Sequence, residues 1–129
     1  MTATELDHVA HALESLEWFP EASHPTGVLV ACENLDTRFA IAHHLETLGY
    51  DVWTAGSGQD AYETGRDHPM GIDMLVCDAN LRHLSAPELF RRLKARHSGL
   101  QCCVMVSGGD RAPANEAARL GAVVLDVHN

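Results

Sequence analysis

The chain has 129 residues, which is the length of one domain and enough to bury a hydrophobic core. Apolar residues make up 46% of it, which excludes an intrinsically disordered protein. Nine Lys and Arg against 18 Asp and Glu give a net charge of −9, so bulk electrostatic binding to nucleic acid or to an anionic membrane surface is not expected.

The sequence carries no sign of membrane insertion or export. Its apolar runs are far shorter than the roughly 18 residues that a membrane span needs. The acidic start, MTATELDH, lacks the features of a signal peptide. The cysteines lie inside apolar runs and form no CxxC pair, which predicts buried, reduced thiols rather than disulfides or zinc ligands. We therefore expect a cytoplasmic protein. The four cysteines are Cys32, Cys77, Cys102 and Cys103.

Residues 1–26 are expected to form a helix and a linker that stand apart from the main domain, residues 27–129. A helix is predicted over residues 3–19, because apolar residues recur there at steps of three and four. These residues are Leu6, Val9, Leu13 and Leu16. Residues 20–26, PEASHPT, contain two prolines and are typical of a linker.

From residue 27 onward, strands and helices alternate. Short apolar runs rich in β-branched residues predict the strands, and apolar residues at helical spacing predict the helices. The expected strands are 27–32, 51–55, 72–77, 101–106 and 121–127. The expected helices are 36–48, 59–66, a segment from about residue 85 to before Gly99, and 114–120. This order indicates a parallel sheet with helices on both faces.

Two of the predicted helices carry more detailed signals. The helix over 36–48 carries four apolar residues and is expected to end at Gly49 as a cap. These residues are Phe39, Ile41, Leu45 and Leu48. The later helix begins with Ser85-Ala-Pro-Glu88, which has the spacing of a capping box.

Polar side chains follow the predicted strands where ligands bind in open α/β sheets, at the carboxyl ends of the strands. Glu33 follows the first strand, Asp78 the third and Ser107 the fourth, and His128 ends the fifth. We expect a carboxylate pair, a hydroxyl and a basic group to converge on one edge of the sheet.

The segments VLVACENLDTR, IDMLVCDANLRHLSAPEL, CCVMVSGGD and LGAVVLDVHN resemble the receiver domain of bacterial two-component response regulators. The resemblance covers residues 27–129. It implies a flavodoxin-like (CheY-like), doubly wound α/β fold with five parallel strands in the order 2-1-3-4-5. In this chain the N-terminal helix is an addition to that pattern, and the family's fifth helix, which follows the last strand, is missing.

The resemblance also implies roles for individual residues. Asp78 matches the aspartate that accepts a phosphoryl group from a histidine kinase or phosphotransfer protein. Ser107 matches the hydroxyl residue that contacts this group. Glu33 and Asp78, with the backbone carbonyl of Asn80, match the ligands of Mg²⁺.

Four positions depart from the family pattern. Cys32 replaces a second acid, His128 and Asn129 replace a Lys-Pro pair, and Leu125 replaces an aromatic residue that takes part in the conformational switch. A thiol is a poor ligand for Mg²⁺, and a histidine is cationic only below a pKa of about 6.5. Because phosphorylation of a carboxylate gathers negative charge that cations must offset, we expect weakened Mg²⁺ binding and weakened or absent phosphorylation. The loss of the lysine and the aromatic residue together should also weaken coupling between the site and the far surface.

Three functions therefore remain open. The first is a non-enzymatic receiver domain that regulates an attached output domain or a partner protein. The second is a pseudo-receiver that acts by dimerisation or docking without phosphate. The third is a small flavodoxin-like enzyme or nucleotide binder, for which the sequence offers only a weak G-x-G-x-x-A match at residues 56–61.

The N-terminal helix suggests a separate hypothesis. Without a fifth helix, part of one sheet face would be exposed. We expect the helix over 3–19 to cover that face or to pair with a second chain, through its apolar stripe. The residues of this expected interaction are Leu6, Val9, Leu13 and Leu16.

Overall fold

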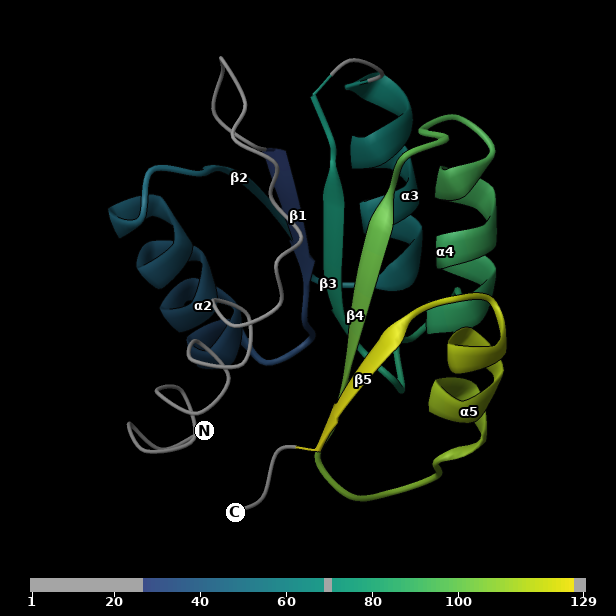
Figure 1. The fold of residues 1–129 in the computed structure, drawn as a ribbon. Coiled ribbons are helices and arrows are strands. Elements are labelled where there is room, and N and C mark those ends of the chain that lie inside the picture. The colour runs from purple at the N-terminus through teal and green to yellow at the C-terminus, as the bar shows by residue number, and fades with distance from the viewer. Residues whose placement is uncertain (1–26, 69–70, 127–129) are drawn as a thin grey trace.

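The computed structural model describes residues 27–68 and 71–126, and these build a five-stranded parallel sheet (Figure 1). The strands lie in the order β2-β1-β3-β4-β5, which confirms the predicted order 2-1-3-4-5. The strands are β1 (Gly27–Ala31), β2 (Asp51–Ala55), β3 (Met74–Asp78), β4 (Gln101–Val106) and β5 (Val123–Asp126).

Four helices connect these strands within the described residues. They are α2 (Leu35–Thr47), α3 (Gly58–Asp67), α4 (Ala86–Lys94) and α5 (Ala112–Arg119). In Figure 1, α2 covers one face of the sheet, whereas α3, α4 and α5 lie on the other. The chain is therefore doubly wound, as the alternating pattern predicts. The helix predicted over residues 3–19, with Leu6, Val9, Leu13 and Leu16, lies outside the described residues.

The core has two layers, one on each face of the sheet. On the side of α2, Ile41 and Leu45 pack against Val30 and Val76. On the other side, Phe90 and further apolar residues of α3, α4 and α5 form the larger layer. The residues of β1 are all buried, which explains why the sequence of this strand is a continuous apolar run rather than an alternating one. The sheet fixes the position of the residues that follow its central strands.

Two of the four apolar residues carried by the predicted helix are buried in α2. Ile41 and Leu45 are buried, but Phe39 is 57% and Leu48 is 44% exposed. The buried face of α2 repeats every four residues through Thr37, Ile41 and Leu45, and Phe39 lies about 200° around the helix from it. Leu48 is the C-cap residue, beyond the last helical turn.

Glycine ends two of the helices in the same way. After α2, Gly49 has φ +96° and its N–H donates to the carbonyl of Glu46, while Tyr50 donates to Leu45. Gly121 closes α5 with the same pattern and has φ +104°. This is the Schellman arrangement, in which glycine adopts the left-handed backbone at little steric cost. The cap predicted at Gly49 is confirmed.

The capping box predicted at Ser85 does not form. Ser85 is the N-cap residue of α4, but its side chain makes no capping hydrogen bond. The Glu88 carboxylate instead pairs with Arg91 and Arg92, one turn further along the helix. The guanidinium groups three and four residues after Glu88 pair with its carboxylate, and these ion pairs form in place of the capping box.

The strand bounds also differ from the prediction. β3 begins two residues later than expected and includes Asp78, whereas β5 begins at Val123 because residues 121 and 122 complete the turn after α5. The Asp73 carboxylate, just before β3, accepts a hydrogen bond from the N–H of Gly27 at 3.0 Å. Because β3 ends on Asp78, the sheet fixes the backbone of that aspartate.

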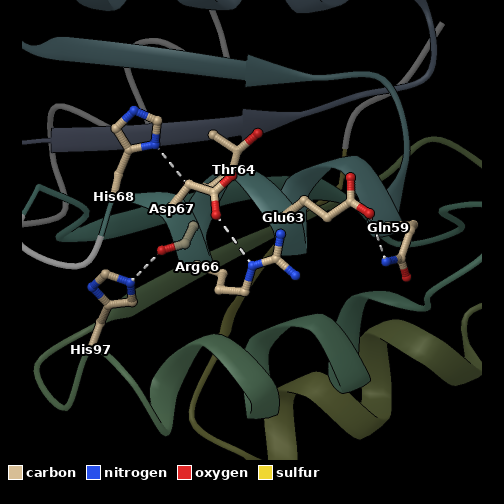
Figure 2. Close-up of polar contacts among 8 residues, drawn as sticks. Gln59, Glu63, Thr64, Arg66, Asp67, His68 and His97 are labelled. Carbon is tan, nitrogen blue, oxygen red and sulfur yellow. Dashed lines mark hydrogen bonds and ion pairs between the residues drawn. The ribbon is translucent and has the colours of Figure 1, made fainter.

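α3 and α4 are joined by a buried histidine (Figure 2). His97 follows α4, and its Nε2 lies 3.0 Å from the carbonyl oxygen of Gly65 in α3. In a continuing helix that carbonyl would accept a hydrogen bond from the N–H of residue 69, but residue 69 is proline and has none. His97 therefore supplies a donor that the sequence of α3 lacks, from the imidazole tautomer protonated on Nε2.

Two further predictions concern the described residues. All four cysteines are buried and free, as expected for reduced thiols in apolar runs. Within residues 27–68 and 71–126, no helix combines the length and the apolar character needed to cross a bilayer.

Candidate functional site

The carboxyl ends of the central strands bring the predicted site residues to one edge of the sheet. The register pairs Ala31 of β1 with Cys77 of β3, so Glu33 follows beside Asp78. Asp78 itself pairs with Met105 of β4, and Ser107 follows that strand. Residues far apart in the chain thus meet because the strands are parallel.

Asp78 occupies the centre of this edge. The backbone N–H of Glu33 donates a hydrogen bond to its Oδ2 atom at 3.3 Å. Burial raises the pKa of the Asp78 carboxyl from 3.8 to about 6, the hydrogen bond from Glu33 lowers it, and the negative charge of Glu33 raises it. The carboxylate is therefore the main form above about pH 6, which suits a nucleophile or a metal ligand at neutral pH.

Cys32 lies next to Asp78 and is fully buried. Burial, followed by the negative charge of Asp78, raises the pKa of its thiol well above the ordinary value. The Cys32 carbonyl accepts a hydrogen bond from Nη1 of Arg38 at 3.0 Å. A neutral thiol brings no anionic ligand, so the acidic pair of this site consists of Glu33 and Asp78 alone.

The Glu33 carboxylate is held by Arg82, which lies in the loop between β3 and α4. The backbone N–H of Arg82 donates to Oε1 of Glu33 at 2.5 Å, and the Arg82 Nε atom lies 3.2 Å from Oε2. We call this contact the Glu33–Arg82 pair. The sequence prediction missed it, since a lone arginine in a polar loop carries no spacing signal, and only the opposite charges suggest a contact.

The side chain of Asn80 connects two loops at this edge of the sheet. Its side-chain amide donates to the carbonyl of Asp110 at 3.2 Å and so links the β3–α4 loop to the β4–α5 loop. Ser107 is exposed in the second of these loops. The hydroxyl of Ser107 is therefore accessible from solvent at the same edge as Asp78.

Glu33 and Asp78 are the side chains at this edge that could hold a hard divalent cation. Mg²⁺ commonly binds through one or two carboxylates and keeps several waters. Glu33 and Asp78 supply two carboxylates, and the backbone carbonyl of Asn80 is a further oxygen donor. Over the described ranges, no cluster of three or more His, Cys, Asp or Glu side chains suits a metal ion. The donor set is thus limited to two side chains.

Other residues singled out in the sequence are placed as follows. Leu125 is half-buried in β5 and packs against the α2 side of the core. His128 and Asn129 lie outside the described residues. The G-x-G-x-x-A segment forms the start of α3, where the Ser57 hydroxyl caps the helix by accepting the N–H of Asp60 at 3.1 Å. Ser57 therefore serves as a helix cap in this segment.

Comparison with known proteins gives consistent results. The family model described as the response regulator receiver domain matches residues 28–125. Over 103 residues the chain is 29% identical to the virulence sensor protein BvgS of Bordetella pertussis. This match covers 77% of the chain but 8% of BvgS, so the chain spans a small part of the length of this curated relative.

Solved structures show the same fold. A response regulator receiver domain protein from Clostridium thermocellum has a TM-score of 0.70 at 22% identity, covering 81% of this chain and 82% of its own. The CheX–CheY–BeF3–Mg²⁺ complex from Borrelia burgdorferi gives a TM-score of 0.69 at 15% identity, covering 80% and 78%. The predicted flavodoxin-like, CheY-like architecture is confirmed.

Proposed function

Because the chain belongs to the family of response regulator receiver domains of two-component signalling, we propose that Asp78 accepts a phosphoryl group at a weakened Mg²⁺ site. The observation that carries this proposal is the position of Asp78 at the end of β3, beside the Glu33 backbone and with a pKa of about 6. The domain would then regulate an attached output domain or a partner protein. It would act in the cytoplasm, as a signalling domain rather than an enzyme.

The phosphoryl donor would be a phosphohistidine of a histidine kinase or a phosphotransfer protein. An oxygen of the Asp78 carboxylate attacks phosphorus, an O–P bond forms, and the N–P bond breaks with its electron pair left on the imidazole. The attacking carboxylate must be ionised, so the reaction slows below about pH 6. Ser107 would donate its hydroxyl hydrogen to a phosphoryl oxygen.

Glu33, Asp78 and the backbone carbonyl of Asn80 would hold Mg²⁺. When bound, the ion offsets the negative charge of the phosphoryl oxygens. The neutral thiol of Cys32 adds no ligand, which is the reason to expect a weak site. His128, when protonated, would add a second positive charge.

Incubation of the chain with Mg²⁺ and acetyl phosphate, followed by intact mass measurement, tests the proposal. The wild-type chain should gain one phosphoryl group at pH 7.5, more slowly at pH 5. The Asp78→Asn variant should gain none, and the exposed Asp51→Asn variant should behave like the wild type. Absence of any gain in the wild type would overturn phosphorylation at Asp78.

A second candidate function is a pseudo-receiver that binds a partner or a second copy of the chain without phosphate. The Glu33–Arg82 pair favours it, because Arg82 holds both oxygens of one of the two acids. Partner binding that is the same for the wild type and Asp78→Asn, with no gain in mass, would support this function over the first.

A further inference from the structure

We propose that Arg82 competes with a divalent cation for the Glu33 carboxylate, so that the Glu33–Arg82 pair sets the affinity of the site for Mg²⁺. The inference rests on the proposed function in one respect, namely that Glu33 is a metal ligand. It adds a residue that the sequence comparison gives no reason to choose, and it concerns binding rather than phosphorylation.

Both carboxylate oxygens of Glu33 are in contact with Arg82. One oxygen accepts the backbone N–H of Arg82 at 2.5 Å, and the other lies 3.2 Å from the Nε atom of the same residue. A cation that uses Glu33 as a ligand must take either the oxygen that accepts the Arg82 N–H or the oxygen that is paired with the Arg82 guanidinium. The two contacts with Arg82 therefore oppose metal binding at Glu33.

The backbone of Arg82 is anchored independently of its side chain. Its carbonyl accepts a hydrogen bond from the N–H of Gly58, at the start of α3, at 3.1 Å. In the same loop, Leu81 and Leu84 are buried in the core layer on the side of α3. Removing the guanidinium should therefore leave the loop in place and change only the charge pair.

The strength of the competition follows from exposure. The side chain of Arg82 is 77% exposed and that of Glu33 is 26% exposed, so water screens the attraction between them. Exposed ion pairs contribute little to stability, and the backbone N–H contact stays when the side chain is removed. We expect loss of the guanidinium to tighten Mg²⁺ binding by about two- to five-fold.

The coupling is reciprocal. If Arg82 weakens the binding of the cation, then the bound cation weakens the contact between Arg82 and Glu33 by the same factor. Binding of Mg²⁺ would thus weaken the contact between Glu33 and a guanidinium group that is already largely exposed. The metal would change the charge that this loop presents to a partner.

The test is a Mg²⁺ titration of the whole chain followed by amide NMR shifts of residues 33 and 78. Arg82→Ala should bind Mg²⁺ about two- to five-fold more tightly than the wild type. Arg66→Ala is the matched control, since it removes one positive charge from an exposed ion pair with Asp67 on α3. It should leave the affinity unchanged. In the wild type, the Nε–H signal of Arg82 should shift as Mg²⁺ binds.

Glu33→Gln provides the second control. In that background, Arg82→Ala should no longer change the affinity, because the competition needs the carboxylate. An affinity of Arg82→Ala equal to that of Arg66→Ala would overturn the inference, and so would an Arg82→Ala effect that persists in the Glu33→Gln background. These outcomes are read from metal binding, whereas the proposed function is read from the mass of the phosphorylated chain, so the two can fail separately.

Discussion

At the residue scale, Asp78 combines a buried position with an ionisable group. Burial disfavours its charged form, and the N–H of Glu33 offsets only part of that cost. A phospho-acceptor must nevertheless be ionised to react. Asp78 therefore destabilises the fold at the pH at which it is chemically useful.

This cost predicts how stability depends on pH. The folded-state pKa of Asp78, about 6, lies above its ordinary value of 3.8, so the folded state binds the proton more tightly. The contribution of Asp78 to stability should thus be highest below about pH 4 and fall as the pH rises to about 6. Asp78→Asn should be more stable than the wild type by about 1–3 kcal/mol at pH 7.5, and equally stable near pH 4. Urea unfolding across this range measures the difference.

The exposed Asp51→Asn substitution is the control for this prediction. It removes one negative charge from the same sheet without removing a buried one. If both variants gained equally at pH 7.5, the effect would come from net charge rather than from the burial of Asp78.

The site residues differed in how well the sequence predicted them. The proximity of Glu33 and Asp78 follows from the parallel strands, because each residue comes just after the apolar run of its strand. No periodic pattern in the sequence predicts that Arg82 belongs to the site. Its contact with Glu33 depends on the path of an irregular loop, 49 residues further along the chain.

At the element scale, α3 depends on α4 for one of its hydrogen bonds. Proline at position 69 cannot donate to the Gly65 carbonyl, and the buried imidazole of His97 does so instead. His97→Ala should leave that carbonyl without this donor and destabilise the chain by about 1–3 kcal/mol. Thermal or urea unfolding measures the loss.

His43→Ala is the matched control, because His43 is exposed on α2. It should change the stability by less than about 0.5 kcal/mol. Equal losses in the two variants would contradict the role assigned to His97.

The sequence predicted the elements better than their faces and ends. The strands were clear because a buried parallel strand is apolar along its whole length. Apolar residues alone do not define the buried face of α2, because that face includes the polar Thr37 and excludes Phe39. The capping-box spacing at Ser85 does not form the box, because the Glu88 carboxylate pairs with Arg91 and Arg92 instead.

At the scale of the whole molecule, the four cysteines are distributed over both layers of the core. Cys32 and Cys103 lie on the side of α2, and Cys77 and Cys102 lie on the side of α3, α4 and α5. All four are buried, and burial raises the thiol pKa of Cys32 and Cys103. Thiolates are the reactive form, so native thiols should react slowly.

Alkylation should therefore report on unfolding of the whole domain. In native buffer the chain should take up no iodoacetamide over the time in which the urea-unfolded chain takes up four equivalents, as counted by intact mass. Partial labelling of the native chain at Cys32 and Cys103 alone would show that the α2 layer opens independently of the other.

The contact of His97 with Gly65 also bears on the order in which the molecule folds. The two residues are 32 positions apart, and β3 and α4 lie between them. During synthesis, α3 emerges before the residue that completes its last turn. The Gly65 carbonyl should therefore stay bound to water until β3 has joined the sheet and α4 has docked, when His97 replaces that water.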